Sequence, residues 1–418
     1  MAENNLLTEL RERAVKGLTE TLGFFAEHAR DPDGGFFGAV GRDLVPDKSS
    51  PRSVVLTARL VWSFANAYRV IGNPEYLDFA LHAFRYLKER LIDTEYGGAY
   101  WHVGPDGEPS DDRKYIYGQA FVIYGGSELA RACILRGGDE KVIAEAKDLA
   151  VSVYKLCEEF ARDKVYGGYY ESFDRQWNRL PDSFNIPDPS AGSKALNTHL
   201  HIIEAYTNLM RVWDDKDLRA RVGELIDIMS HKLLDREVFH YKPYMADNWQ
   251  GTKKLVSFGH DIEASWLLVE AAHEFGDESI LRDAIPTSVR IADSCYKSGI
   301  DPETGGMWYE YHAETGEYEK MMSWWTQAEA VVGFFNAYQI TGEQKYFDYA
   351  LGTWDYIDRC VIDREGGMFR EWLSDASQPA GSDTNRYPAN PWKTPYHNGR
   401  MYMEIIERTD KMLAEKNR

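Results

Sequence analysis

Histidines and carboxylates stand at the beginning of several segments whose apolar residues recur with helical spacing. The stretch from Ser257 to Trp266 is the clearest example, because Ile262 and Trp266 follow a helical pattern while the first turn holds His260 and Glu263. In a helix these two residues are three positions apart and share a face. A buried histidine beside a carboxylate can act as a general base with its orienting partner, and it can equally be a hydrogen-bonded core histidine.

Five other segments show the same exception, each near its start. Arg59 is a charged residue in an otherwise apolar segment. Asn197 and His201 are four positions apart in one segment, and Trp325 and Glu329 are four positions apart in a later one. Each residue alone has a structural explanation, such as an ion pair for Arg59 or a place in the core for Trp325. Because all six segments show the exception at the same place, we expect one shared pocket. Its predicted members are Arg59, Tyr117, Asn197, His201, His260, Glu263, Trp325, Glu329 and His397.

A short pattern recurs six times and locates these segments. It begins with an aspartate, continues in five copies to a Gly-Gly pair and ends in aromatic or other large apolar residues, while the fourth copy lacks the glycines. The aspartates are 62 to 72 residues apart, which indicates a repeat architecture. They are Asp31, Asp93, Asp163, Asp235, Asp301 and Asp363.

Each copy of the pattern lies between two segments of helical spacing. The segments before the copies are 6–29, 74–92, 140–161, 216–234, 278–298 and 344–361, and those after them are 53–72, 113–137, 194–213, 257–276, 321–341 and 395–414. Twelve helices in six antiparallel pairs predict an all-α fold, an (α/α)6 barrel or toroid of about twelve helices. The Gly-Gly pieces predict short β-hairpins on one rim, with turns at Pro105-Asp106-Gly107 and Thr315-Gly316.

The predicted toroid determines where the polar helix starts meet. All starts of the inner helices lie at one end of the ring, so their side chains face one pocket. A closed ring has no natural boundary, and we expect a single domain over residues 1–418. The longest loops are expected at about 174–193 and 373–394, and loops of that length in a compact domain are often functional.

The composition excludes several classes of partner. The 418 residues carry a net charge of −19, which disfavours nucleic acid and an anionic membrane surface. Aromatic residues make up 13% of the chain, enough for a large core or for a carbohydrate-binding cleft. The four cysteines lie in helical patterns without a CxxC pair, and no apolar run reaches membrane-spanning length. We therefore expect buried free thiols and a cytoplasmic protein.

At the predicted pocket the sequence resembles the cellobiose 2-epimerases of the N-acylglucosamine 2-epimerase family. The resemblance covers nearly the whole chain, and its family fold is an (α/α)6 barrel. The matching pieces are Ala58-Arg59, Asn197-Thr198-His199-Leu200-His201, Ser257 to Leu267, Trp324-Trp325, Gln327-Ala328-Glu329-Ala330, Trp392-Lys393 and Pro395-Tyr396-His397-Asn398-Gly399-Arg400.

The resemblance implies a role for each pocket residue. His260 and His397 match the two acid/base histidines, Arg59 and His201 match residues at the reacting end of a sugar, and Glu263 and Glu329 would orient histidines. Aromatic and polar contacts to the sugar would come from Trp325, Trp392, Tyr117 and Asn197, with Asp188 as a further binding residue and Trp308 as a candidate for a second-sugar subsite. Thr57 and Thr326 depart from the residues common in relatives, which leaves the substrate preference open.

The implied reaction is inversion of C2 in the reducing-end aldose of a disaccharide such as cellobiose, lactose or mannobiose, from the glucose to the mannose configuration. The sugar ring would open, and two histidines would exchange the C2 proton through a cis-enediolate. No metal or nucleotide cofactor is implied, and we expect a monomer or weak homodimer that binds a small sugar.

Other functions remain open from the sequence. A mannose/glucose 2-epimerase or a mannose isomerase could use the same pocket, and an inverting glycoside hydrolase would need two carboxylates across the scissile bond. A metal site formed by His201, His260, Glu263 and His397 has no dense ligand motif to support it. A non-catalytic sugar-binding protein would explain the tryptophans but not the paired histidines.

Overall fold

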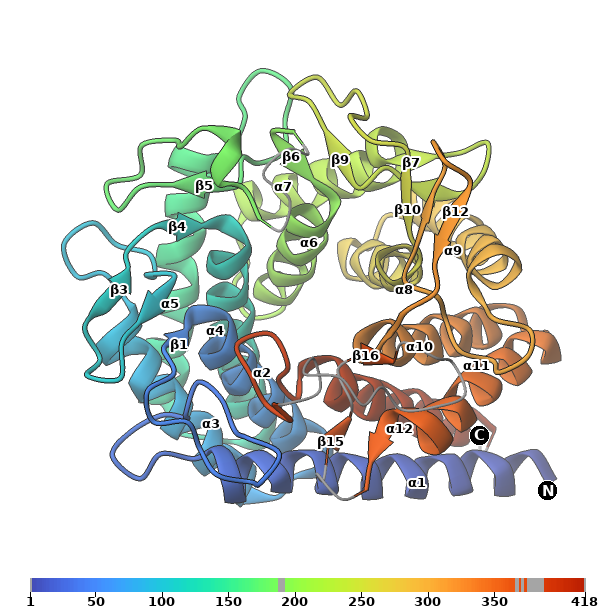
Figure 1. Cartoon of the computed structure of the whole chain (residues 1–418), viewed down its shortest axis with the longest axis horizontal. Helices are drawn as coiled ribbons and strands as arrows, with labels where there is room; N and C mark the ends of the chain where they lie inside the picture. The colour runs from blue at the N-terminus through green and yellow to red at the C-terminus, as the bar shows by residue number, and fades with distance from the viewer. Residues whose placement is uncertain (1, 187–191, 365–367, 370–371, 374–386, 417–418) are drawn as a thin grey trace.

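The computed structural model describes residues 2–186, 192–364, 368–369, 372–373 and 387–416. These residues form twelve α-helices arranged in two concentric rings around a central axis (Figure 1). The inner helices are α2 (Val54–Ile71), α4 (Ile116–Arg136), α6 (Leu196–Met210), α8 (Phe258–Phe275), α10 (Trp324–Thr341) and α12 (Tyr396–Lys416). The outer helices are α1 (Ala2–Phe24), α3 (Pro74–Tyr86), α5 (Glu140–Leu156), α7 (Lys216–Asp227), α9 (Glu278–Gly299) and α11 (Gln344–Tyr356).

The predicted (α/α)6 barrel is confirmed, because the inner helices contact one another in a closed circle. Each inner helix packs against the next in chain order, and α12 packs against α2. Each inner helix also packs against the outer helix that follows it, while α12 packs against α1 at the beginning of the chain. The sixth helix pair is therefore built from the two ends of the described chain.

The two rings differ in how their sequences are buried. Every residue of α2 from Val54 to Ala67 is buried, whereas α3 buries a narrow stripe that includes Ala80, Ala83 and Phe84. A helix that is apolar on all sides must be surrounded by protein, and a helix with an apolar stripe covers the outside. The linker between these two helices is short because Gly72 ends α2 in the left-handed conformation and Asn73 caps α3.

Most outer helices end in one wide turn of π-helix. These turns are Phe25–Ala29, Leu87–Leu91, Cys157–Ala161, Ile228–Leu233 and Ile357–Val361. A 3-10 turn also occurs at Asp182–Phe184. The hydrophobic spacing of the sequence extends through the π turns, so the predicted segment ends lie beyond the α-helices.

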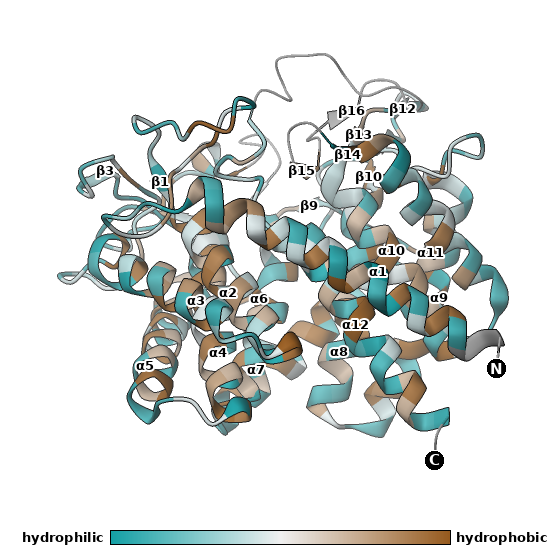
Figure 2. Ribbon diagram, turned by 90° about the horizontal axis from the view of Figure 1, so that it is seen from below, coloured by the Kyte–Doolittle hydropathy of each residue, from teal (hydrophilic) through white to brown (hydrophobic). Residues whose placement is uncertain are grey.

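Short strands connect the helices on one rim. They are β1 (Arg52–Ser53), β2 (His102–Val103), β3 (Pro109–Asp111), β4 (Lys114–Tyr115), β5 (Ser172–Phe173), β6 (Lys194–Ala195), β7 (Leu234–Asp235), β8 (His240–Tyr241), β9 (Tyr244–Met245), β10 (Leu255–Ser257), β11 (Glu310–His312), β12 (Glu317–Glu319), β13 (Met322–Ser323), β14 (Ile362–Asp363), β15 (Met368–Phe369) and β16 (Trp372–Leu373). In Figure 2 the labelled strands lie on the upper side and the helices below them.

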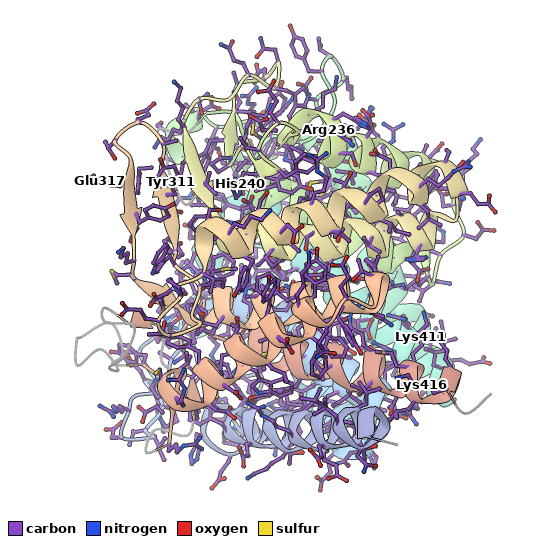
Figure 3. All side chains as sticks on the ribbon, turned by 90° about the vertical axis from the view of Figure 1, so that its right-hand side faces the viewer. Arg236, His240, Tyr311, Glu317, Lys411 and Lys416 are labelled. Carbon is purple, nitrogen blue, oxygen red and sulfur yellow. The ribbon has the colours of Figure 1, made fainter. Side chains whose placement is uncertain are left out.

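Figure 3 shows the same separation from another side. Tyr311 and Glu317 of the β11–β12 hairpin lie at the end opposite Lys411 and Lys416 of α12. The predicted turns at Pro105-Asp106-Gly107 and Thr315-Gly316 fall between β2 and β3 and between β11 and β12, as expected.

The strands connect neighbouring repeats around the ring. The strand before an inner helix pairs antiparallel with a strand of the next repeat, as in β1 with β2, β4 with β5, β6 with β9, β10 with β11 and β13 with β16. The next repeat also caps the helix: the carbonyl of Trp101 accepts from the N–H of Val54 at 3.0 Å, and the carbonyl of Glu171 accepts from that of Ile116 at 2.9 Å. Each helix start is thus held by the following hairpin.

The repeated aspartate also holds a helix start. Lys114, two residues before α4, donates to Asp93 at 2.9 Å and to the carbonyl of Gly97. Lys194, two residues before α6, donates in the same way to Asp163 and to the carbonyl of Gly167, both at 2.7 Å. Both lysines are buried, so each ion pair fixes the distance between a hairpin and an inner helix.

The second glycine of a pair is required by close packing. Gly98 and Gly168 have φ values of 69° and 73°, and a Cβ atom at either position would lie 2.5 Å from a tryptophan ring. The residue that follows the glycine pair is bound by the fourth residue of an inner helix: Gln119 binds Ala99, His199 binds Tyr169 and Gln327 binds Met307.

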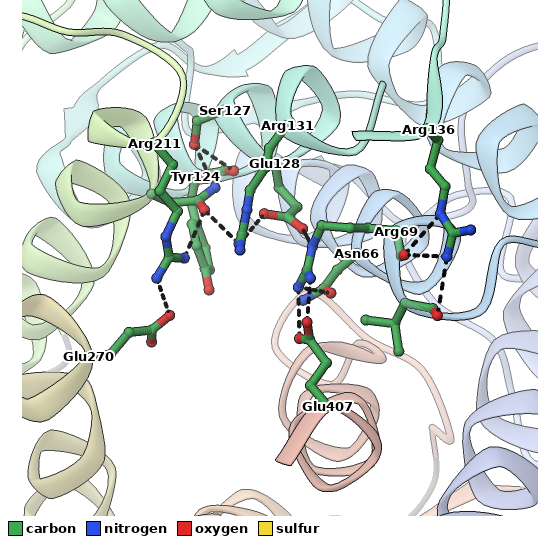
Figure 4. A network of polar contacts seen from close by, with 12 residues as sticks. Asn66, Arg69, Tyr124, Ser127, Glu128, Arg131, Arg136, Arg211, Glu270 and Glu407 are labelled. Atoms are coloured by element: carbon green, nitrogen blue, oxygen red, sulfur yellow. Dashed lines mark hydrogen bonds and ion pairs between the residues drawn. The ribbon is translucent and has the colours of Figure 1, made fainter. Parts of the chain in front are cut away.

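The end of the barrel opposite the hairpins holds a cavity of about 540 Å³ lined by charged side chains. Figure 4 shows part of this network, in which Arg69 lies between Glu128 and Glu407 while Arg211 donates to Glu270 at 2.6 Å. Arg69 and Arg211 pair with carboxylates of neighbouring helices, while Arg131 and Arg408 pair within their own helices, so ion pairs tie the helices together at this end.

The four cysteines are free and buried, as predicted. None of the helices in the described ranges is long and apolar enough to cross a lipid bilayer.

Candidate active site

A second cavity lies at the hairpin end of the inner ring and has a volume of about 220 Å³. It is lined by Arg59, Tyr117, Ile186, Asn197, His201, His260, Glu263, Tyr309, Trp324, Trp325, Trp392 and His397. Eight of the nine predicted pocket members are in this wall, and the ninth, Glu329, lies directly behind His397. The predicted convergence of the helix starts on one cavity is what the structure shows.

The second and sixth residues of the inner helices supply most of this wall. In α6 they are Asn197 and His201, and in α4 the second residue is Tyr117. Arg59 is the sixth residue of α2 and Glu263 the sixth of α8. Residues four apart share a helix face, so one face of each helix start points to the ring axis.

Two histidines of the cavity pack against the same tryptophan. The ring of Trp325 is 4.8 Å from that of His260 and 5.5 Å from that of His397, measured between centroids. His260 comes from α8 and His397 from α12. Burial lowers the pKa of His260 to about 3 and that of His397 well below its usual value, so both imidazoles are neutral at pH 7.

Each histidine is held through its Nδ1 atom. His397 Nδ1 lies 2.8 Å from Glu329 Oε1, and His201 Nδ1 lies 3.1 Å from Glu204 Oε2. His260 Nδ1 instead lies 2.8 Å from the hydroxyl of Ser257. Since Nδ1 is engaged, Nε2 is the atom that remains for chemistry in each ring.

The resemblance predicted that Glu263 orients a histidine, and the structure gives it another partner. Glu263 is one helical turn deeper than His260, where it accepts a hydrogen bond from Arg400 of α12. Its Oε2 atom is buried and has no partner among the described residues. Glu263 therefore lines the cavity without holding His260.

Arg400 lies beneath the histidines at the centre of a buried network. Its guanidinium donates to Glu204, Glu263 and Glu329, and also to the hydroxyl of Tyr396. Burial raises the pKa of Glu204 and of Glu329, and Arg400 acts in the opposite direction. Three carboxyls share this one cation, so protons are retained in the network at neutral pH.

Arg59 keeps its charge available to the cavity. Its guanidinium donates to the hydroxyl of Tyr117 at 2.7 Å and to the carbonyl of Trp392 at 3.1 Å. It also lies over the rings of Phe121 and Tyr396, at 4.3 and 4.6 Å. In the part of the chain that the structure describes, Arg59 forms no ion pair with a carboxylate, so it can stabilise an anion in the cavity.

The aromatic predictions have different outcomes. Trp325 and Trp392 line the cavity, and Trp392 is 43% exposed, which places it at the mouth. Trp308 is not part of the wall: its ring packs against Tyr318 at 5.0 Å, and Tyr309 lines the cavity instead. Adjacent residues of an extended segment face opposite sides, so only one of the two can point inward.

The remaining predicted positions lie away from the cavity wall or outside the described residues. Asp188 lies outside the described residues. Thr57 and Thr326 donate to the backbone carbonyls of Ser53 and Ser323, at 3.0 and 2.9 Å. Both threonines are buried within their helices and do not line the cavity.

Four contributors were missed by sequence reasoning: Glu204, Arg400, Ser257 and Tyr309. Glu204 follows His201 by three positions and shares its helix face, which is a signal that the sequence offers. Arg400 follows His397 by three positions, and a charged residue in the first turns of an inner helix is the same signal as Arg59. Ser257 and Tyr309 lie in extended segments, where no helical spacing indicates their direction.

Metal-ligand atoms come close together at one point of the site. Glu263, Glu329 and His397 bring such atoms within 4.8 Å of one another. The guanidinium of Arg400 donates to both carboxyls, so a cation already lies between them. This donor set fits an arginine-centred network better than a metal centre.

Known proteins resemble this chain over nearly its whole length. The family model of N-acylglucosamine 2-epimerase matches residues 35–397. The cellobiose 2-epimerase of Bacteroides fragilis is 36% identical over 401 residues, which cover 95% of this chain and 98% of that protein. The cellobiose 2-epimerase of Dictyoglomus turgidum is 34% identical, covering 92% and 95%. The solved structure of the cellobiose 2-epimerase from Bacillus thermoamylovorans superposes with a TM-score of 0.86 at 36% identity, covering 97% and 100%.

Proposed function

The chain belongs to the N-acylglucosamine 2-epimerase family, and we propose that it is a sugar 2-epimerase, an isomerase that inverts C2 of a reducing-end aldose. The proposed substrates are disaccharides of the cellobiose, lactose or mannobiose type, because relatives that match nearly the whole chain are cellobiose 2-epimerases. The observation that carries the proposal is a pair of neutral histidines on different helices around one cavity, the half-buried His260 and the buried His397.

Inversion at C2 requires a proton to leave one face and another to arrive on the opposite face. The C2 proton of an open-chain aldose is acidic because the aldehyde delocalises the resulting anion. In one direction His260 removes the proton through Nε2 and becomes an imidazolium, while His397 delivers a proton from Nε2 to the opposite side of the planar cis-enediolate and takes one at Nδ1 from the Glu329 carboxyl. General acid–base steps of this kind contribute about 10²–10⁴-fold each.

Arg59 stabilises the oxyanion that forms at the former aldehyde oxygen. Its charge is unpaired among the described residues, and Tyr117 and the carbonyl of Trp392 fix its orientation. A preorganised donor at a developing charge contributes about 3–4 kcal/mol. His201, whose Nδ1 is held by Glu204, supplies a second polar group at the same end of the sugar.

The network of carboxyls around Arg400, below the histidines, retains the proton that one histidine needs. One histidine must carry a proton when the other does not, and the surplus of carboxyls around Arg400 favours retaining it. Glu329 contacts His397 directly, so a proton can pass between them without reaching solvent. We assign Arg400 and Glu204 as positioning residues, because they act through the histidines.

Aromatic rings hold the sugar while its carbon chain rotates. Trp325 packs against both histidines, and Trp392 lies at the mouth, where a second sugar unit would extend. Tyr117 and Asn197 offer polar groups on the cavity wall. The assignments of Asp188 to substrate binding and of Trp308 to a subsite outside the cavity stay predictions.

The geometry argues against hydrolysis. An inverting glycosidase places its two carboxyls about 6.5–9.5 Å apart, with room for water between them. Oxygen atoms of Glu263 and Glu329 lie within 4.8 Å of each other, and Arg400 donates to both. These carboxyls are therefore held together by Arg400 and do not flank a glycosidic bond.

Proton exchange in D2O tests the proposal. Cellobiose and, separately, mannose are incubated with the enzyme in D2O containing EDTA, and NMR follows C2 and the products. Deuterium at C2 with formation of glucosyl-mannose from cellobiose is the expected result. Conversion of mannose alone to glucose would indicate a monosaccharide epimerase, and fructose would indicate an isomerase. No exchange on any aldose, or inhibition by EDTA, would contradict the two-histidine mechanism.

We also propose that residues 1–418 form one domain that acts in the cytoplasm as a monomer or weak homodimer. Contacts between α12 and α2 close the inner ring and leave no boundary within it. The four buried free thiols suit a reducing compartment. Light scattering across a concentration series tests the oligomeric state.

A further inference from the structure

A buried carboxyl lies behind the cavity wall and has no role in the reaction proposed above. Glu171 is 2% exposed and follows the third Gly-Gly pair. Its side chain accepts a hydrogen bond from the hydroxyl of Thr198, on α6, and interacts with the backbone N–H of Tyr117, on α4. Its own carbonyl accepts from the N–H of Ile116 at 2.9 Å. Glu171 thus joins the starts of two neighbouring inner helices.

The same position carries an aromatic ring in two of the other four Gly-Gly copies, and Gly38 and Arg370 in the remaining two. The third residue after the glycine pair is Trp101 in the second copy and Tyr309 in the fifth. Tyr309 lines the cavity, and Trp101 packs 6.0 Å from Trp392 at its mouth. Their carbonyls cap the preceding inner helix as that of Glu171 does. Glu171 thus places an acid where these two copies place an aromatic ring that borders the cavity or its mouth.

No cation neutralises this acid in the described part of the chain. Glu171 forms no ion pair there, and its Oε1 atom is buried without a hydrogen-bond partner. Burial raises the pKa of Glu171 to about 8, and the N–H of Tyr117 acts in the opposite direction. The titratable side chains that face it are Tyr115 on β4 and Tyr117 on α4, while α6 presents Thr198. Below pH 8 the carboxyl is mainly uncharged.

The two helix starts that Glu171 joins carry cavity residues. Tyr117 accepts a hydrogen bond from Arg59 at 2.7 Å, so a shift of α4 moves the cation assigned to the enediolate. Asn197 immediately precedes Thr198 and lines the same cavity. A misplacement of about 1 Å at such groups can lower a rate about 10²-fold.

We propose that Glu171 is a positioning residue that joins the starts of α4 and α6 and so keeps Tyr117, Arg59 and Asn197 in place for the reaction. The activity readout rests on the proposed epimerase function. The carboxyl suits this role, because it accepts from the Thr198 hydroxyl of α6 and interacts with the Tyr117 N–H of α4. Ionisation would leave a buried, unpaired charge behind the oxyanion site.

Two substitutions of Glu171 separate the effect of its hydrogen-bonding groups from that of its ionisable carboxyl. Glu171→Gln keeps a donor and an acceptor, so we expect its kcat at pH 7 to stay within about threefold of wild type. Glu171→Ala removes the link, and we expect kcat to fall about 10²-fold with little change in KM. Glu158 provides the matched control, because it is a partly buried glutamate that Tyr169 and Tyr206 hydrogen-bond away from the cavity. We expect Glu158→Ala to change the free energy of unfolding but to leave kcat and KM unchanged.

The pH dependence is a second readout, which a purely structural residue would not change. From pH 7 to pH 9 wild type ionises Glu171 and the glutamine variant cannot, so we expect the ratio of E171Q to wild-type kcat to rise about tenfold. Titration of Glu329 affects both proteins and cancels in the ratio. A constant ratio, or E171Q as impaired as E171A, would overturn the proposal.

Hydrogen exchange tests the link without any substrate. In E171A, peptides over residues 113–121 and 194–201 should both exchange faster than in wild type, and E158A should leave these two segments unchanged. Unchanged exchange in either segment would overturn the proposal even if the protein acted on no sugar. Absence of C2 exchange in wild type would instead contradict the proposed function alone.

Discussion

His260 and His397 differ in the group that holds Nδ1, and this difference gives them unequal basicity. A carboxyl holds His397, and a serine hydroxyl holds His260. A carboxylate that accepts a hydrogen bond from Nδ1 stabilises the imidazolium more than a hydroxyl does. Under the proposed mechanism, the two faces of the enediolate would therefore meet histidines that are held by different groups.

Replacing one histidine should separate proton exchange from epimerisation. We expect His397→Asn to lower conversion about 10²–10⁴-fold, because protonation of one face is lost. His260 remains, so deuterium should still enter C2 of one epimer and not of the other. NMR in D2O, started from each epimer in turn, measures both quantities. His273→Asn is the control, since His273 lies on α8 like His260 but lines the cavity at the opposite end. Full conversion by His397→Asn would contradict the two-histidine mechanism.

The acid side of the pH profile should be unusually flat. Burial lowers the pKa of His260 to about 3, with a smaller contribution from His201, so its base form persists in mild acid. A histidine with the ordinary pKa of 6.5 would lose about 30-fold in its base form between pH 7 and pH 5. We expect kcat/KM to change less than threefold over this range. A tenfold fall, with circular dichroism showing an intact fold, would mean that His260 titrates normally.

The repeat assigns one helical position to the same structural task in several helices. The fourth residue of α4, α6, α8 and α10 binds the backbone of the hairpin that precedes it. Glutamine does this in α4 and α10, histidine in α6 and Asp261 in α8. Asp261 also lies 2.7 Å from Nδ1 of His240, which occupies the place of a missing glycine. The side chain changes while the contact is retained, so contact geometry is what the repeat preserves.

Glutamine should therefore replace His199. We expect the free energy of unfolding of His199→Gln to stay within about 1 kcal/mol of the wild-type value at pH 7, because Gln119 and Gln327 already make this contact. His199→Ala should lose roughly 3 kcal/mol, since it leaves the N–H of Tyr169 buried without a partner. Urea denaturation measures both. Equal losses in the two variants would show that the ring itself, and not the hydrogen bond, is needed.

The pH dependence of stability checks the same contact. Burial lowers the pKa of His199 to about 4, so between pH 6.5 and 4 the unfolded chain binds more protons than the folded one. Wild type therefore loses stability as pH falls through this range, by about 3 kcal/mol from this residue. His199→Gln should lose correspondingly less over the same range.

At the scale of elements, the sequence predicted the architecture well because the repeat and the hydrophobic spacing are local signals. The predicted segments 257–276 and 321–341 contain α8 and α10 almost residue for residue. The π turns were not predicted, because the same apolar spacing fits either kind of turn. Pocket residues on helices were located by their position, whereas Tyr309 was missed in favour of Trp308, since only the pairing of β10 with β11 decides which neighbour points inward.

The whole molecule decides what no local pattern can show. Glu204 and Arg400 are 196 residues apart and meet because the ring closes between α12 and α2. Ring closure also makes α1 the outer partner of α12, the helix that carries His397 and Arg400. Helix α1 thus supports the helix that carries the proposed acid/base residue His397. Stability of the whole ring and geometry of the site should respond together when this pair is disturbed.

Two glycines of α1 allow this coupling to be measured. A Cβ atom at Gly17 would lie 2.3 Å from the ring of Tyr402 on α12, whereas a Cβ at Gly23 would meet nothing within 4 Å. We expect Gly17→Ala to cost about 1–3 kcal/mol through overpacking, and Gly23→Ala to gain about 0.5–1 kcal/mol from helix propensity. Urea denaturation measures both effects.

The kcat values of these two variants show whether α1 helps to position His397 or contributes only to the stability of the fold. Tyr402 follows His397 by five residues on the same helix, so a shift of α12 that accommodates Gly17→Ala also moves His397 against Trp325 and Glu329. We expect kcat to fall in Gly17→Ala and to stay unchanged in Gly23→Ala at a temperature where both are folded. If Gly17→Ala lost stability but kept full kcat, the inner ring would hold the histidines without help from α1, and the sixth pair would serve only to close the barrel.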